Sequence, residues 1–123
     1  MAQSTISAAS WQKVKQEIRE ILIGLAKLQK TIAYSELAAQ IRSAYIHYRA
    51  PAFDHILQEL CEDEVKSGHP ILGVLVVNKQ TKRCGAGFFK WCAHQGYDVS
   101  DPERFWNNEF DRVCDYWDLI EVR

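Results

Sequence analysis

The stretch PILGVLVVNKQTKRCGAGFF, residues 70–89, decides the fold that the sequence predicts. Residues 70–77 are apolar and rich in valine, which predicts a short buried strand. Residues 78–84 are polar and basic, and residues 85–89 are expected to return as a second strand. Strand, basic loop and strand together predict a β-hairpin with a long tip.

Two helices and a minimal strand are predicted at the start of the chain. Apolar residues at helical spacing predict the first helix over residues 11–29, with Ser10 as its cap. Residues 31–33 are partly β-branched and predict the strand. Ser35 is then expected to cap a second helix that ends near Ser43.

The third helix is predicted to begin at Pro51, because proline suits the first helical position. Gly68 is expected to end it in the left-handed conformation. Between the second and third helices, residues 44–49 lack clean periodicity and predict a connection.

The end of the chain is also predicted to be helical. Residues 90–95 predict a short helical turn closed by Gly96. Asp101 and Pro102 together predict the start of a last helix, as cap and first residue.

Three helices, a hairpin and a last helix form the element order of a winged helix, an α+β fold in which the hairpin is the wing. We expect one winged-helix-like domain over residues 1–123, with residues 1–9 as a flexible arm. The apolar residues expected to form its core are Trp11, Ile18, Leu22, Leu25, Leu37, Ile41, Phe53, Ile56, Leu57, Leu60, Leu72, Val74, Val76, Phe88, Trp106, Phe110, Val113 and Trp117.

The composition excludes several classes of protein. With 47% hydrophobic and 25% charged residues, the chain is typical of a globular domain and not of a disordered one. The net charge of −1 gives no general attraction to nucleic acid, so any electrostatic binding must be local. No apolar run approaches the ~18 residues of a membrane span, and residues 1–10 lack a signal peptide's pattern. We therefore expect a cytoplasmic protein without a membrane partner, whose four cysteines are reduced.

The segment Thr31-Ile32-Ala33-Tyr34-Ser35-Glu36-Leu37-Ala38 resembles the T-x-x-Y-G-E-L-A stretch of the alkylguanine-DNA alkyltransferase family. In that family the stretch opens the helix-turn-helix of a winged-helix-like DNA-repair domain. Pro70-Ile71-Leu72, followed by valines, resembles the segment that leads to the family's reactive site. The resemblance covers roughly residues 31–77 with interruptions, and it implies a DNA-associated fold.

The chain departs from that family at the reactive site, which has the motif Pro-Cys-His-Arg-Val. Aligning the prolines places Ile71 at the nucleophile, and aligning Pro-Ile-Leu places Leu75 there. Because neither residue is a cysteine, alkyl transfer is not expected. The chain from Pro70 to the tryptophan-rich last helix also resembles small bacterial proteins without an assigned function, which implies no activity.

Local basic charge indicates nucleic-acid binding, with duplex DNA at the wing and at the start of the third helix. Basic side chains bracket the connection before that helix and occupy or adjoin the wing, and aromatic and histidine side chains accompany them. The candidate binding residues are Arg42, Arg49, Lys79, Lys82, Arg83 and Lys90, with Tyr45, Tyr48 and His55.

The third helix opposes this prediction, because its five acidic residues against one lysine give it a net charge of −4. A phosphate-lined groove repels such a helix. The alternative is therefore a protein-interaction module without a nucleic-acid role, with the acidic helix or the aromatic last third as its surface. A homodimer through the first and last helices is a further expectation.

Catalytic and metal sites are not expected. Cys84, Cys92 and His94 are spaced C-x7-C-x-H, without the paired short spacings of structural zinc. Cys84 lies in the basic loop and is expected to be an exposed thiol without a base beside it. We therefore expect a non-enzymatic protein without a cofactor.

Overall fold

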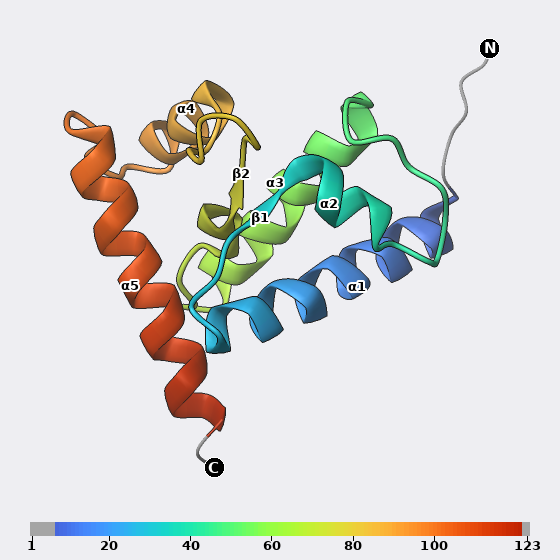
Figure 1. Cartoon of the computed structure of the whole chain (residues 1–123), viewed down its shortest axis with the longest axis horizontal. Coiled ribbons are helices and arrows are strands. Elements are labelled where there is room, and N and C mark those ends of the chain that lie inside the picture. The colour runs from blue at the N-terminus through green and yellow to red at the C-terminus, as the bar shows by residue number, and fades with distance from the viewer. Residues whose placement is uncertain (1–6, 122–123) are drawn as a thin grey trace.

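The computed structural model describes residues 7–121, with side chains as far as Asp118, and is mostly helical (Figure 1). Two very short strands complete it, so the α+β class is confirmed. The elements in chain order are α1 (Ala8–Lys27), β1 (Ile32–Ala33), α2 (Tyr34–Ala39), α3 (Pro51–Lys66), the 3-10 helix η1 (Leu72–Leu75), β2 (Val76–Val77), α4 (Ala86–His94) and α5 (Pro102–Glu121).

The predicted hairpin is wrong. β1 and β2 pair in parallel, with Ile32 opposite Val76 and Ala33 opposite Val77. Residues 70–75 therefore do not run on as a strand, and residues 85–89 do not return beside them. The region expected to form the wing is instead a buried turn, a two-residue strand, a loop and a helix.

The apolar run is buried as predicted, but most of it is a turn and not a strand. Ile71, Leu72, Val74 and Leu75 are all fully buried, and the Val74 N–H donates to the Ile71 carbonyl at 3.2 Å, which closes the turn locally. The 3-10 turn η1 packs against α1, α3 and α5 (Figure 1), so its side chains are covered from several directions. Three long helices thus cover the residues that were predicted to form the first strand of the hairpin.

Residues 86–94 form helix α4 because their apolar side chains recur at helical spacing. Phe88, Trp91 and Cys92 are three and four positions apart and share the inner side of α4. Gly85 occupies the position before the helix with extended backbone. Gly85 thus precedes the helix, and Gly87 lies in its first turn.

Helix boundaries agree with the sequence where a proline or glycine sets them. Pro51 begins α3, Gly68 follows it with φ 81°, and Gly96 follows α4 with φ 97°. Pro102 begins α5, and the side chain of Asp101 accepts a hydrogen bond from the Arg104 backbone at 3.2 Å. Backbone restrictions of single residues therefore predicted these ends correctly.

The two predicted serine caps are wrong. Ser7 caps α1 and accepts from the Ser10 backbone N–H at 3.1 Å, so Ser10 lies inside the helix. Ser35 lies inside α2, and the Glu36 carboxylate instead accepts the Ala33 backbone N–H at 3.1 Å. Residues 1–6 of the expected flexible arm lie outside the described residues.

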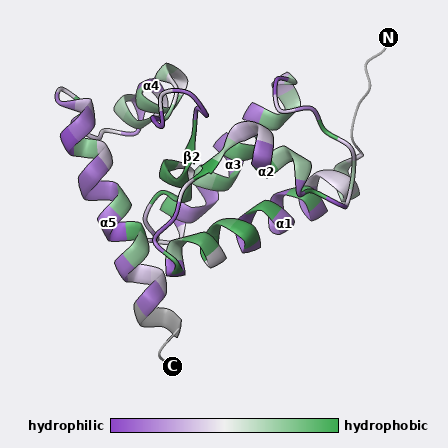
Figure 2. Ribbon diagram, viewed as in Figure 1, coloured by the Kyte–Doolittle hydropathy of each residue, from purple (hydrophilic) through white to green (hydrophobic). Residues whose placement is uncertain are grey.

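One main core lies between α1, α3, η1 and α5, where Figure 2 shows the apolar ribbon segments converging. Most of the predicted core residues are buried there. The predicted residues that pack against the core while only partly buried are Trp11, Leu25, Ile41, Phe88, Trp106 and Phe110. Over residues 7–121, no helix combines the length and apolar character that a membrane crossing needs.

Candidate functional site

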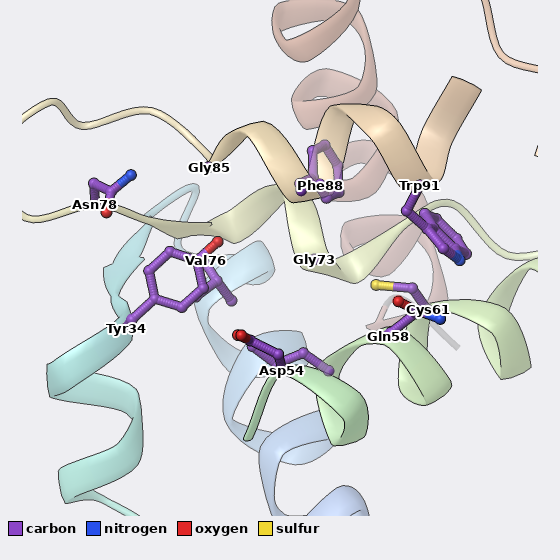
Figure 3. Close-up of a pocket in the computed structure, with 12 residues that line it drawn as sticks. Tyr34, Asp54, Gln58, Cys61, Gly73, Val76, Asn78, Gly85, Phe88 and Trp91 are labelled. Atoms are coloured by element: carbon purple, nitrogen blue, oxygen red, sulfur yellow. The ribbon is translucent and has the colours of Figure 1, made fainter. Parts of the chain in front are cut away.

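Aromatic side chains from α2 and α4 line a pocket of about 320 Å³ beside α3 (Figure 3). Tyr34 is the first residue of α2, directly after β1, and Phe88 and Trp91 extend from the inner side of α4. Asp54 and Gln58, one helical turn apart on α3, close another side. We call this concavity the aromatic pocket.

Backbone and small side chains shape the inner wall of the aromatic pocket. Cys61 of α3 points its sulfur towards Gly73 of η1 (Figure 3). A Cβ atom on Gly73 would lie 2.6 Å from that sulfur and 3.4 Å from the Phe88 ring, so only glycine fits without displacement. This close approach joins α3, η1 and α4 at the inner wall.

The ionisable groups of the inner wall are held in their neutral forms. Burial raises the pKa of the Cys61 thiol to about 12, although a hydrogen bond with the Gly73 backbone opposes the shift. Burial likewise raises the pKa of the Tyr34 hydroxyl to about 12. At neutral pH the pocket therefore offers a phenol and a thiol, and it holds no thiolate nucleophile.

A second, polar concavity of about 440 Å³ adjoins the aromatic pocket. Tyr34, Asp54 and Asn78 line both spaces, so the two share a wall. Arg49, from the connection before α3, and Lys79, from the loop after β2, line the polar one with Ser35, Tyr48 and Gln80. We call this second space the polar hollow.

The loop that supplies Lys79 is closed by its own backbone. The Asn78 N–H donates to the Arg83 carbonyl at 2.8 Å, and the Lys82 N–H donates to the Asn78 carbonyl at the same distance. Lys82 has a φ of 60°, which allows the tight reversal. The loop therefore keeps a compact basic tip although the predicted hairpin is absent.

Of the residues predicted to bind nucleic acid, the structure brings Arg49, Lys79 and Tyr48 together in the polar hollow. The Arg49 guanidinium lies 5.4 Å from the centre of the Tyr48 ring, a cation–π distance. Arg49 and Tyr48 are thus placed by one local contact, and Lys79 reaches the same space from a distant part of the sequence.

Other predicted residues lie elsewhere. Arg83 pairs with Glu103 of α5 at 3.0 Å, and both side chains are exposed. Arg42 lies beside α1, where its backbone N–H donates to Glu17 at 2.8 Å. Tyr45 is 86% exposed and borders α2. The remaining predicted residues are exposed and do not line the polar hollow: Lys82 in the loop, Lys90 on α4 and His55 on α3.

The acidic residues of α3 divide into two groups. Towards α1, Lys15 Nζ binds Glu59 Oε2 at 2.6 Å and Asp63 Oδ2 at 2.7 Å. Arg19 Nε binds Glu64 Oε2 at 2.6 Å, and His69 Nδ1 lies 2.8 Å from Glu64 Oε1.

Towards α4, Glu62 accepts hydrogen bonds from neutral groups, Gln58 Nε2 at 3.2 Å and Trp91 Nε1 at 3.4 Å. Asp54 lines both concavities. The carboxylates of α3 that face α1 are thus paired with Lys15, Arg19 or His69, whereas Asp54 and Glu62 have no ion-pair partner among the described residues.

The cysteines are buried, so the expectation of an exposed Cys84 is wrong. Its sulfur packs under the backbone of η1 and β2 and lies 3.2 Å from the Val76 carbonyl oxygen. Burial raises the pKa values of Cys84 and Cys92 to about 12. Among the described residues, no three His, Cys, Asp or Glu side chains are placed to hold a metal ion.

The sequence reasoning missed the aromatic pocket because it assigned residues 85–89 to a strand. Reading the spacing of Phe88, Trp91 and Cys92 as helical places two aromatic rings on one side of α4. Tyr34 gave a weaker signal, since a tyrosine directly after a buried strand end lies at the border of the core.

Comparison with protein-family models, with curated proteins and with solved structures gives no match to this chain. Its residues and their geometry therefore carry the functional argument.

Proposed function

We propose that this protein is a non-enzymatic nucleic-acid-binding protein whose polar hollow contacts the phosphate backbone. The observation that carries the proposal is the meeting of Arg49 and Lys79 in one concavity with the hydroxyl groups of Ser35 and Tyr48. Cationic and hydroxyl side chains are the groups that most often contact phosphate oxygens.

Ion pairing of the acids of α3 supports this proposal, because it weakens the main argument against DNA. Glu59, Asp63 and Glu64 are each within ion-pair distance of a cationic or histidine side chain. The helix therefore repels phosphates less than its sequence charge of −4 indicates, and the repulsion is concentrated at Asp54 and Glu62.

In the proposed binding mode the chain acts as a modified winged helix. Helices α1, α2 and α3 precede a basic loop, residues 78–83, which takes the place of a hairpin wing. The connection between α2 and α3, residues 40–50, is longer than the roughly three- to four-residue turn of a helix-turn-helix. We therefore propose that contacts come from this connection and from the basic loop, with little insertion of α3 into a groove.

The test is fluorescence anisotropy of a labelled DNA duplex, titrated at about 50 and about 150 mM salt. Replacing both Arg49 and Lys79 by alanine should weaken binding and lower the log–log salt slope by about two units, one for each lost phosphate contact. Lys66→Ala with Arg104→Ala is the matched control, because these exposed residues carry the same charge and line neither concavity.

Absence of binding by the wild-type protein at low salt would refute the proposal. Equal weakening by the control pair would also refute it, because binding would then depend only on net charge.

A protein-interaction module is the second candidate, and Tyr45 favours it. This large ring is 86% exposed and borders a concavity formed by α2 and the connection. Exposed aromatic side chains are enriched at protein interfaces. Self-association through α1 and α5 belongs to this candidate, although their apolar stripes already pack against each other within one chain.

A further inference from the structure

We infer that the aromatic pocket binds a small organic cation with an aromatic or apolar body. The pocket brings three aromatic rings and a carboxylate into one space, whereas the polar hollow beside it carries the basic side chains. The inference concerns a different ligand from the proposed nucleic acid and does not rest on that proposal.

The shape of the pocket suits a small molecule. Its volume of about 320 Å³ is near the lower end of the range for ligand sites, roughly 300 to 1,000 Å³. Tyr34, Phe88 and Trp91 supply aromatic surface, and Gln58 and Asn78 supply amide groups at the edge. Such a mainly apolar lining with a few polar groups is typical of sites that bury most of a small ligand.

The charge of the pocket selects the class of ligand. Asp54 lines it, and among the described residues no cationic side chain lies within 4.0 Å of this carboxylate. The Glu62 carboxylate lies next to the pocket lining, where it accepts hydrogen bonds from the side chains of Gln58 and Trp91. Lysine, arginine and histidine are all absent from the lining. The pocket thus favours positive charge over negative charge.

The contrast within α3 strengthens this assignment. Glu59, Asp63 and Glu64 all have cationic or histidine partners from α1 or from residue 69, whereas Asp54 faces the pocket without one. Asp54 is therefore free to pair with a bound cation. The faces of the neighbouring rings attract the same charge, since an aromatic ring is electronegative over its face.

The test uses two ligands of one shape that differ in charge, (4-hydroxyphenyl)trimethylammonium and the neutral 4-tert-butylphenol. Each is titrated into the ¹⁵N-labelled chain and followed by two-dimensional NMR, in which the amides of Gly73, Gly85 and Gly87 report on the pocket. We expect the cation to shift these signals and to bind about tenfold more tightly than its neutral counterpart.

Variants localise the effect. Asp54→Asn should remove most of the preference for the cation, and Trp91→Leu should weaken binding of both ligands. Asp63→Asn is the matched control, because this acid lies on the same helix but pairs with Lys15. The affinity of the Asp63→Asn variant for the cation should be unchanged. Replacing Arg49 and Lys79 by alanine should not weaken cation binding, since it removes positive charge from the hollow that Asp54 also lines; this separates the site from the proposed phosphate contacts.

Three results would overturn the inference. They are equal affinity for the two ligands, an undiminished preference in the Asp54→Asn variant, and absence of pocket shifts with either ligand. NMR spectra of each variant without ligand establish that it is folded, so a loss of binding by Asp54→Asn or Trp91→Leu is not mistaken for unfolding.

Discussion

The two sides of α3 carry the same kind of side chain and use it differently. Towards α1, Glu59, Asp63 and Glu64 are held by cations at 2.6 to 2.7 Å. Towards the concavities, Asp54 and Glu62 have no such partner among the described residues. The difference teaches that the net charge of a helix says little about its surface until its packing partners are known.

The difference also separates stability from recognition. The Glu64 side chain is only 4% exposed, so its charge must be compensated within the protein. Asp54 is exposed and needs no such compensation. We therefore expect substitutions facing α1 to change stability, whereas a substitution of Asp54 should change ligand binding and leave stability within about 0.5 kcal/mol.

The largest effect is expected from Arg19→Met. It keeps much of the side-chain volume but leaves the buried Glu64 carboxylate without its guanidinium. Removing one partner of a buried pair costs about 3 to 5 kcal/mol, and since the Arg19 side chain is 28% exposed we expect about 2 to 4 kcal/mol. Urea unfolding followed by circular dichroism measures the loss.

The double variant Arg19→Met with Glu64→Gln is the control for this interpretation. It removes the uncompensated charge and should be more stable than Arg19→Met alone. If the double variant were less stable than the single one, the loss would come from packing or from the cation–π contact between Arg19 and Trp117, which lie 5.3 Å apart.

A smaller effect is expected from Gly73→Ala in η1, at the inner wall of the aromatic pocket. The added Cβ would lie 2.6 Å from the Cys61 sulfur, and overpacking of this kind costs about 1 to 3 kcal/mol. Because Cys61→Ala removes the opposing atom, the two substitutions together should cost less than the sum of their separate effects. If the losses in free energy of unfolding were strictly additive, contact with the Cys61 sulfur would not be the cause of the destabilisation by Gly73→Ala.

The smallest effect is a pH dependence at Glu59. Its hydrogen bond with Lys15, followed by that with Trp11, lowers the pKa of this carboxyl below 4.5. A lowered pKa in the folded state gives stability that is present above pH 4.5 and is lost as the pH falls through the folded-state value. The advantage of the wild type over Glu59→Gln in free energy of unfolding should therefore shrink on acidification.

Unfolding of these two proteins between pH 7 and pH 3 measures this difference. The Glu59 side chain is 38% exposed, so solvent screening keeps the effect small. A difference that stayed constant over this interval would mean that the pKa of Glu59 is the same in the folded and unfolded chains.

The helices were predictable because their signals lie within a few residues. The apolar stripe of α1, the proline that begins α3 and the glycine at residue 68 each act through local geometry. The hairpin was not predictable in the same way. Whether residues 70–77 form a strand or a turn depended on the helices that cover them.

The candidate site shows the same difference between what local sequence predicts and what the fold decides. The sequence identified Arg49, Tyr48 and Lys79 as basic or aromatic residues close to expected turns, and it identified the acids of α3. It did not indicate that Arg49 and Lys79 share one hollow, because they come from segments that meet only in the fold. Nor did it indicate the aromatic pocket, which required α4 to be a helix.

By itself, the sequence determined the positions of the long helices, the apolar residues of the core and the lack of a dominant overall charge. These properties follow from side-chain periodicity and backbone restrictions, which act over short distances along the chain. Only the tertiary structure decided the parallel pairing of β1 with β2, the ion pairing on one side of α3 and the meeting of the two concavities. Each of these depends on contacts between distant segments, whose free energies no local pattern encodes.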